Sequence, residues 1–217
     1  MTYRTYDVGL FNYSKVCERH NLNDCRREGY EVFNSVGMNL VGFDVETTGL
    51  SPKSGDRIVS LGAVKVDYKS GAVIDQFSTL INPCRDVGAT FIHGITDEDV
   101  QNAPLFKDAY PSLLDFFSDG LIVGHNLRFD EGFLSSELKL AGFLDRVTFP
   151  SICTLRLAQK YLQGCSNHKL ESCAAAFDIE VKKYHDAVCD ALASVEILRS
   201  LIGKANLEIM VPLMQKF

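Results

Sequence analysis

Four acidic residues and one histidine are the residues of this chain whose types and spacing could do chemistry. Asp44 and Glu46 lie two positions apart in the apolar segment VGFDVETTG, so both side chains point to the same face if this segment is a strand. Asp130 follows an apolar stretch in GHNLRFD, and His185 and Asp190 share the segment YHDAVCDA. Two neighbouring carboxylates in an apolar strand repel each other and are costly to bury, whereas a bound cation removes both penalties. The acidic pair therefore indicates a site that binds a cation.

Each of these residues has a plainer interpretation when it is taken alone. Asp44 and Glu46 could lie on a solvent-exposed strand face, and Asp130 could be one of the acidic residues that the start of a helix favours. His185 could be a surface histidine, and Asp190 could be an ordinary polar position on a helix. The functional interpretation depends on the combination of all five residues, in this order and in these contexts.

Four segments in the same order, FDVETTGL, IHGIT, VGHNLRFD and HDAVCDA, resemble the signature segments of the DEDDh family of 3′–5′ exonucleases. This family includes the proofreading subunit epsilon of bacterial DNA polymerase III, oligoribonuclease and ribonuclease T. The resemblance covers residues 39–203. It implies a ribonuclease H-like α/β fold, with a five-stranded mixed sheet and helices on both faces. It also implies a metal-dependent 3′–5′ exonuclease that releases nucleoside 5′-monophosphates from single-stranded DNA or RNA 3′ ends.

The resemblance assigns a role to each of the five residues. Asp44, Glu46, Asp130 and Asp190 become the ligands of two divalent metal ions, Mg²⁺ or Mn²⁺, and His185 becomes the general base. Two such ions can activate a water molecule and stabilise the departing 3′ oxygen of a phosphodiester. A histidine with a pKa near 6.5 is suited to take the proton of the attacking water.

The resemblance also points to substrate contacts. These are expected in the turn after the first strand, in IHGIT and in GHNLRFD, at Thr47, Thr48, Leu50, His93, Asn126 and Phe129. His93 has the alternative role of a capping histidine near Thr96, and for Phe129 packing in the core is the favoured interpretation. Two positions depart from the family pattern. Cys153 stands where many members have an aspartate, and Gly88 stands where the bacterial proofreading subunit has an acidic residue, which puts close similarity in substrate handling in doubt.

Several segments have the patterns of the strands and helices that would position these residues. The alternation of apolar residues predicts a meander of three antiparallel strands, followed by alternating helices and strands. Pro111 is expected to divide the helical segment after Pro104 into two pieces. Strands are expected at 39–49, 57–68, 73–81, 121–126 and 149–155, and helices at 97–100, 104–120, 127–142, 154–163, 168–177 and 187–203, with Thr96 and Asp186 as N-caps.

The 217 residues are enough for one domain with a short appendage. We expect an N-terminal extension of unknown role at 1–38, with a loose helix over 14–35. The exonuclease domain is expected at 39–203 and a short C-terminal segment at 204–217. Hydrophobic residues make up 46% and charged residues 23%, as in globular proteins, and the net charge of −6 argues against a broad basic surface for duplex DNA.

The chain has neither the apolar run of about 18 residues that a membrane-spanning helix needs nor the apolar core of a signal peptide. We therefore expect a soluble, cytoplasmic protein without a membrane partner. The seven cysteines form no CxxC pair and are expected to be reduced thiols. A zinc site made of Cys165, His168 and Cys173 is a weak alternative, because the spacing fits no common zinc finger.

Four functional hypotheses remain open at this point. An exonuclease that acts on DNA in proofreading or repair is the leading hypothesis, and an RNA-trimming exonuclease of the oligoribonuclease or ribonuclease T type is the alternative within the same chemistry. A non-catalytic module that binds 3′ ends would be expected to lack one of the five signature residues, and none is lacking. A polymerase-docking module would use residues 1–38 to bind a polymerase or another protein partner.

Overall fold

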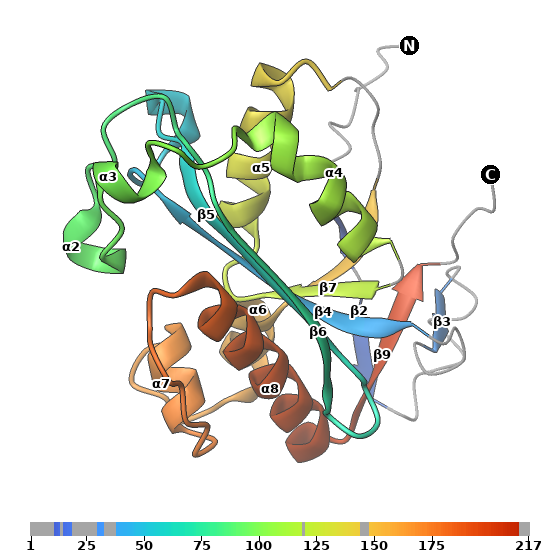
Figure 1. The fold of residues 1–217 in the computed structure, drawn as a ribbon. Coiled ribbons are helices and arrows are strands. Elements are labelled where there is room, and N and C mark those ends of the chain that lie inside the picture. The colour runs from blue at the N-terminus through green and yellow to red at the C-terminus, as the bar shows by residue number, and fades with distance from the viewer. Residues whose placement is uncertain are drawn as a thin grey trace, which may run out of the picture.

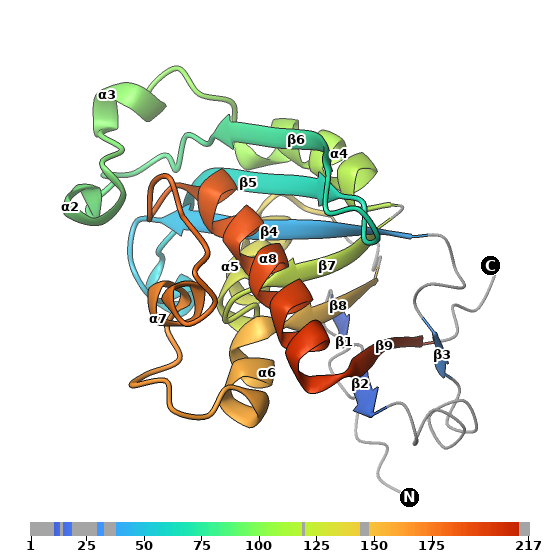
Figure 2. The ribbon, with the colours of Figure 1, turned by 90° about the horizontal axis from the view of Figure 1, so that it is seen from below.

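A mixed six-stranded sheet forms the centre of the molecule in the computed structural model, which describes residues 11–13, 15–18, 30–32, 38–118, 120–143 and 148–212. The strand order is β1-β8-β7-β4-β5-β6 (Figures 1 and 2). The strands are β1 (Phe11–Tyr13), β4 (Asn39–Thr47), β5 (Ile58–Val66), β6 (Val73–Leu80), β7 (Gly120–Gly124) and β8 (Phe149–Cys153). The five strands β4 to β8 are those predicted from the sequence, so the ribonuclease H-like mixed sheet is confirmed. β1 adds a sixth strand that pairs in parallel with β8.

The meander and the parallel strands meet at β4. β5 pairs antiparallel with both β4 and β6. β7 pairs in parallel with β4, and β8 pairs in parallel with β7. β4, β5, β7 and β8 are buried along most of their length, which explains why each is a nearly continuous apolar run in the sequence. Two acidic residues near the carboxyl end of β4, Asp44 and Glu46, interrupt its apolar run, as expected from the sequence.

Helices cover both faces of the sheet (Figures 1 and 2). On one face, α4 and α5 enclose a core around Phe43, Leu113 and Phe133. On the other face, α8 packs on a core around Leu40 and Val195, with α6 and α7 beside it. The helical segments, in chain order, are the 3₁₀ helix η3 (Pro52–Ser54), α2 (Thr90–His93), α3 (Asp97–Val100), α4 (Phe106–Phe117), α5 (Arg128–Leu140), α6 (Thr154–Tyr161), α7 (Leu170–Ala175) and α8 (Ala187–Ala205).

Two glycines allow α8 to lie directly against the sheet. A Cβ atom added at Gly42 in β4 would lie 2.3 Å from the backbone oxygen of Ala191, and one at Gly62 in β5 would lie 2.3 Å from the backbone carbon of Ala187. Both distances are far below van der Waals contact, so a larger residue at either position requires the helix to move. Because Asp190 lies between the two contact points on α8, this close packing sets the distance between Asp190 and β4.

Two expectations about local structure were wrong. Pro111 does not divide α4, which is continuous from Phe106 to Phe117. The missing N–H and the ring of an interior proline cost about 3 kcal/mol. The buried face of α4, which includes Leu113 and Phe117, outweighs this cost while Pro111 itself faces solvent.

The loose helix expected over 14–35 is contradicted where this segment is described. Residues Lys15–Glu18 form β2 and residues Tyr30–Val32 form β3, and both pair antiparallel with β9 (Leu207–Pro212) in a second sheet of order β2-β9-β3. The backbone groups of β2 and β3 therefore pair with the backbone of β9 instead of with each other in a helix. The remaining parts of 1–38 and of 204–217 lie outside the described residues, and the boundaries at 39 and 203 stay a prediction.

No helix in the part of the chain that the structure describes is both long enough and apolar enough to cross a lipid bilayer.

Candidate active site

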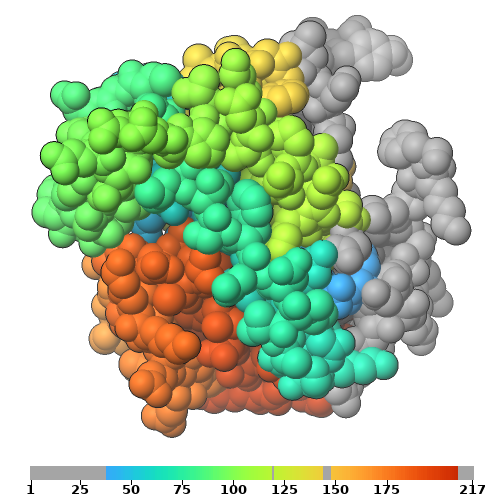
Figure 3. All heavy atoms as spheres, viewed as in Figure 1, coloured from blue at the N-terminus to red at the C-terminus, as the bar shows by residue number. Residues whose placement is uncertain are grey.

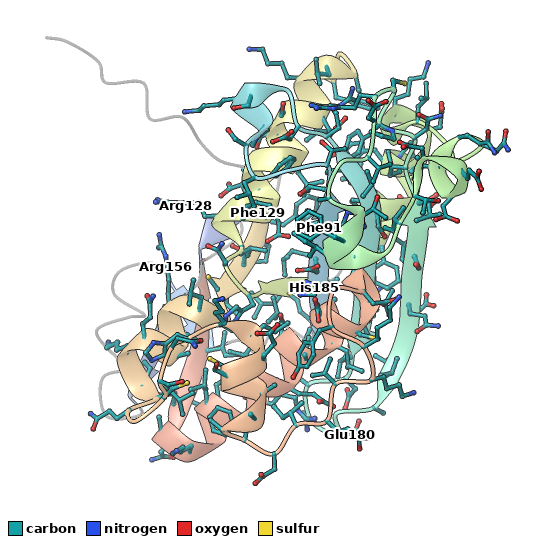
Figure 4. The ribbon with its side chains drawn as sticks, turned by 90° about the vertical axis from the view of Figure 1, so that its left-hand side faces the viewer. Phe91, Arg128, Phe129, Arg156, Glu180 and His185 are labelled. Atoms are coloured by element: carbon teal, nitrogen blue, oxygen red, sulfur yellow. The ribbon has the colours of Figure 1, made fainter. Side chains whose placement is uncertain are left out.

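A cavity of about 580 Å³ opens at the end of the sheet where β4 stops. Figure 3 shows the surface hollowed between the green segment of α2 and α3 and the orange segment of α7 and the start of α8. In Figure 4 the side chains of Phe91, Phe129 and His185 lie around this hollow. The cavity is lined by all eleven residues singled out from the sequence: Asp44, Glu46, Thr47, Thr48, Leu50, His93, Asn126, Phe129, Asp130, His185 and Asp190.

The acidic side chains come from three elements. Asp44 and Glu46 lie on β4, where their Cα partners on β5 are Gly62 and Ser60. Asp130 is in the first turn of α5, and its Oδ1 accepts a hydrogen bond of 3.2 Å from the backbone N–H of Val45. This bond attaches the start of α5 to β4 between the two acidic residues of that strand.

His185 and Asp190 are held together by the start of α8. Asp186 is the N-cap of this helix, as expected, and its side chain accepts from the backbone N–H of Cys189. One turn later, Asp190 Oδ2 accepts a 3.0 Å hydrogen bond from the backbone N–H of His185. His185 has a positive φ of 58°, which turns the chain sharply before the helix. Its half-exposed ring lies 3.8 Å, measured from Nε2, from Oε1 of Glu171.

Glu46, His185 and Asp190 form the group of metal-ligating side chains found within the described residues. One ligand atom from each lies within 4.8 Å of the other two. Asp190 Oδ1 is buried and has no hydrogen-bond partner. A buried carboxylate oxygen without a partner is costly, and a cation beside it would remove that cost. The carboxylate oxygens of Glu46 and Asp190 are ligands that suit Mg²⁺ or Mn²⁺.

Burial and mutual repulsion disfavour the charged forms of these acids. Burial, followed by repulsion from Asp190, raises the pKa of Glu46 to about 7. Burial raises the pKa of Asp190 to about 6, although the His185 N–H bond opposes this. Burial and the charges of Asp130 and Glu46 raise the pKa of Asp44 well above its usual value. Such accumulated, unfavourable negative charge in a cavity is typical of functional sites rather than of structural ones.

The turn after β4 is already held by its own hydroxyl groups. Thr47 donates to the backbone oxygen of Gly49 at 2.6 Å. The hydroxyl of Thr48 accepts from the backbone N–H of Arg57 at 3.0 Å and faces the carboxylate of Asp56 at 3.4 Å. These hydroxyls therefore shape the wall of the cavity, and the exposed side chain of Leu50 extends beyond them at its rim.

His93 serves both of the roles considered for it. Its Nδ1 accepts from the backbone N–H of Ile95 at 3.0 Å, so it does support the loop before Thr96, which itself caps α3. Its Nε2 is buried near the backbone of Thr47 without forming a hydrogen bond, and the ring lines the cavity. Burial lowers the pKa of His93, which favours the neutral imidazole.

Phe129 packs and lines the cavity at the same time. Its ring centroid lies 4.9 Å from that of Phe133, which is fully buried, while Phe129 is only partly buried. The expectation of core packing therefore holds for one side of the ring. Asn126 is exposed at the cavity and has a positive φ of 65°.

Residues of the cavity wall that sequence reasoning missed include Phe91, Ile92 and His125. Phe91 is 88% exposed, although phenylalanine is usually buried. A signal for it was present, because Phe91 and Ile92 directly precede His93 in the segment FIHGIT. His125 directly precedes Asn126, and its neighbours in space come from the loop before α7, which no local pattern reveals.

The weak zinc alternative finds no support. The thiols of Cys165 and Cys173 are neighbours, but among the described residues His168 does not join them in a group of three metal-ligating side chains, and Cys173 is buried within α7. Cys84, Cys153, Cys165, Cys173 and Cys189 are free thiols, as expected from the sequence.

Comparisons with known proteins agree with this geometry. The exonuclease family model RNase_T matches residues 41–198. DNA polymerase III PolC-type of Bacillus subtilis (strain 168) is 38% identical over 167 residues, which are 76% of this chain but 11% of that protein. The PolC-type polymerase of Caldanaerobacter subterraneus subsp. tengcongensis is 36% identical over 172 residues, 78% of this chain and 12% of that protein. The chain thus spans only about a ninth of the length of these curated relatives.

Solved structures share the fold. The nuclease domain of 3′hExo, a DEDDh family member bound to rAMP, has a TM-score of 0.68 and 16% identity, over 82% of this chain and 97% of that one. E. coli exonuclease I in complex with a dT13 oligonucleotide has a TM-score of 0.65 and 20% identity, over 78% of this chain and 42% of that one. Exonuclease X in complex with 5′ overhanging duplex DNA has a TM-score of 0.61 and 23% identity, over 77% and 93%.

The family model covers most of the chain and spans all five signature residues, from Asp44 to Asp190. The resemblance to the DEDDh 3′–5′ exonucleases is therefore confirmed at the level of the family. The chain belongs to the RNase_T family of exonucleases.

Proposed function

We propose that this cavity removes nucleoside 5′-monophosphates one at a time from DNA 3′ ends, with two divalent ions and His185 as the general base. The observation that carries the proposal is the meeting of Asp44, Glu46, Asp190 and His185 in one cavity. There the carboxyl pKa values are raised and Asp190 Oδ1 has no partner. This arrangement is unfavourable for an apolar ligand and favourable for cations bound to a phosphate.

The four acids, Asp44, Glu46, Asp130 and Asp190, would hold the ions. When bound, the ions would supply an activated water and neutralise the charge that develops on the leaving 3′ oxygen. Asp130 has one oxygen bonded to the Val45 N–H, so its contribution would come from the other oxygen or through water. The physiological ion is Mg²⁺ or Mn²⁺ by the oxygen-rich donor set.

His185 would take the proton of the attacking water as the new P–O bond forms and the bond to the 3′ oxygen of the preceding nucleotide breaks. Its ring is accessible from the cavity, while its backbone N–H is fixed by Asp190. The terminal nucleotide would lie against the turn of Thr47 and Thr48 and against His93. A cavity of about 580 Å³ is of the size that small-molecule ligands occupy.

DNA is proposed as the substrate because the PolC-type relatives are DNA polymerases and are 36–38% identical over the exonuclease segment. RNA trimming is the alternative, since a protein distinguishes the two by contacts to the 2′-hydroxyl, which no residue here reveals. The test is a gel that follows 5′-labelled single-stranded DNA, the matched RNA and a duplex with a mismatched 3′ end. Each is incubated with Mg²⁺, Mn²⁺ or EDTA.

We expect a ladder that shortens from the 3′ end of DNA, is lost in EDTA and is lost with Asp44→Asn. A ladder on RNA alone would replace DNA by RNA in the proposal. No ladder on any substrate, from folded protein, would overturn the proposed activity in favour of a module that binds 3′ ends without cleaving them.

A proofreading role beside a polymerase is the proposed context, again from the PolC-type relatives. The partner surface proposed from the sequence, residues 1–38, lies mostly outside the described residues. The test compares binding of two proteins to the replicative polymerase of the same organism. One is the 217-residue chain, and the other lacks residues 1–10, which leaves β1 to β3 in place. Equal binding would remove residues 1–10 from the interface.

A further inference from the structure

A second cavity of about 540 Å³ adjoins the first, and the two share His125 and Asn126 as a common wall. It lies between the segment after β7, helix α6 and the loop before α7. Its other lining residues are Leu155, Gln159, Asn167, His168, Lys169 and Leu170. A nucleic-acid strand that ends in the first cavity must leave it by some route, and the second cavity offers one.

We propose that this second cavity binds the nucleotide that precedes the 3′-terminal one, with Lys169 facing the 5′ phosphate of that nucleotide. The inference rests on the proposed exonuclease function, because it assigns the leaving-group side of the same substrate. The second cavity would be a strand-binding subsite, formed in part by the loop before α7.

The lining has the chemistry that a nucleotide requires. Leu155 and Leu170 are half-buried and offer apolar surface to the face of a base, whereas Gln159, Asn167 and Lys169 are exposed around it. The lining contains one lysine and no carboxylate. Amide and ammonium groups suit base edges, sugars and phosphates, and apolar surface suits base stacking.

Another neighbouring cavity is less suitable for a polyanion. It has a volume of about 250 Å³ and adjoins the first cavity through His185 and Asp190. Lys169 lines this cavity as well, but so do the carboxylates of Glu171 and Asp190, and Glu171 lies 3.8 Å from His185. A phosphate placed there would meet two carboxylates, whereas the second cavity has Lys169 and no carboxylate, so charge favours the route past Asn126.

Hydrogen bonds build the second cavity before any ligand arrives. His125 Nε2 lies 2.7 Å from the backbone oxygen of His168, and because a carbonyl only accepts, Nε2 carries the proton. His125 Nδ1 lies 2.9 Å from the hydroxyl of Thr154. His125 therefore joins the segment between β7 and α5 to the loop before α7.

Asn167 stabilises the same loop from inside. Its Oδ1 accepts from the backbone N–H of Lys169 and from the hydroxyl of Ser172, both at 2.9 Å. A loop fixed in this way loses little further conformational freedom when a strand binds, so less binding free energy is lost to ordering. These bonds also define the direction in which the backbone presents Lys169.

The test separates the two cavities by substrate. The p-nitrophenyl ester of thymidine 5′-monophosphate carries its leaving group in place of the preceding nucleotide and therefore engages the first cavity alone. A thymidine dinucleotide engages both cavities, and it is used with and without a 5′ phosphate. The variants are Lys169→Ala and Gln159→Ala, with Lys107→Ala on α4 as a control that removes the same charge from another surface.

For Lys169→Ala we expect KM for the 5′-phosphorylated dinucleotide to rise about fivefold to tenfold. kcat/KM for the p-nitrophenyl ester, and KM for the unphosphorylated dinucleotide, should stay within about twofold of the wild-type values. Gln159→Ala should raise KM for both dinucleotides. An unchanged KM for the dinucleotides in both variants, or an equal loss on the ester, would overturn the subsite.

Binding gives a readout that does not require turnover. Fluorescence anisotropy of a labelled dT4 oligonucleotide in EDTA measures the Kd and its salt dependence. Lys169→Ala should weaken binding at least threefold and lower the magnitude of the salt slope by about 0.7, the value for one phosphate contact on a single strand. A slope equal to that of Lys107→Ala would overturn the phosphate contact. Absence of cleavage by wild-type protein would instead count against the proposed function.

Discussion

Replacement of Glu46 by glutamine should make the metal-free protein more stable, and by an amount that depends on pH. Burial and the neighbouring charge of Asp190 raise the pKa of Glu46 from 4.5 to about 7. The folded state therefore binds a proton more tightly than the unfolded state. The contribution of Glu46 to the free energy of unfolding is therefore most favourable below about pH 4.5. It falls as the pH rises towards 7 and is level above that.

The size of the effect follows from the two pKa values. Since each pH unit between them is worth 1.36 kcal/mol, Glu46 lowers the free energy of unfolding, relative to its value at low pH, by about 3 kcal/mol at pH 8 and by about 1 kcal/mol at pH 5. The side chain is nearly buried, at 8% exposure, so solvent screens little of this cost. For a protein of this size, 1 kcal/mol corresponds to roughly 2–4 °C in Tm. Glu46→Gln should therefore raise Tm by about 6–12 °C at pH 8 and by about 2–4 °C at pH 5.

Thermal unfolding followed by circular dichroism, in EDTA at pH 5 and pH 8, measures this difference. Glu180→Gln is the matched control, because Glu180 is exposed and lines a separate cavity with Arg199, away from His185 in Figure 4. In saturating Mg²⁺ the order should reverse, because only the wild-type protein gains the full binding free energy of the ions. A Tm change that is the same at both pH values, or is matched by Glu180→Gln, would refute the electrostatic argument.

Three further predictions concern residues around the site. His185→Ala should lower kcat by about 10²–10⁴-fold while the Kd for Mn²⁺, measured by calorimetry, changes little; equal activity of mutant and wild type would exclude the general base. Gly62→Ala should lower both Tm and activity because its Cβ would overlap the Ala187 backbone, whereas Gly203→Ala, which has open space, should keep activity; equal effects would argue against the close packing of α8. Arg57→Met should lower Tm by about 6–15 °C, since it leaves the buried carboxylate of Glu137 without its two bonds of 2.7 and 2.8 Å; a change below 2 °C would contradict this.

The sheet could be predicted from the sequence because its strands are buried on both faces. A strand such as β4 is then a continuous apolar run, and the acidic pair Asp44 and Glu46 is conspicuous within it. The caps Thr96 and Asp186 were predictable for a similar reason, because a helix start requires a side-chain acceptor at that position.

Features that depend on tertiary packing could not be predicted in this way. Pro111 was expected to break α4, and only the buried face that packs on the sheet shows why it does not. β1 pairs with β8, which lies more than 130 residues later, so no local pattern could reveal it. The same holds for His125, whose two partners come from α6 and from the loop before α7.

The candidate site lies between these two cases. All eleven residues singled out from the sequence line the cavity, but the sequence did not reveal which of them form hydrogen bonds within the protein. Thr48 is used by the turn itself, and Asp130 commits one oxygen to the backbone of Val45. The exposure of Phe91 at the rim also required the fold, because phenylalanine in a short helix is ordinarily expected to pack inward.

The proposed reaction is hydrolysis of the last phosphodiester bond of a strand at the acidic residues near the end of β4. The most direct measurement is the chemical identity of the first product released from single-stranded DNA labelled in its 3′-terminal nucleotide, determined by mass spectrometry. We predict labelled nucleoside 5′-monophosphate in Mg²⁺ or Mn²⁺, and none in EDTA or from Asp44→Asn or Asp190→Asn. Release of the label as a free nucleoside or within a longer fragment, or release that persists in EDTA, would contradict the proposed reaction.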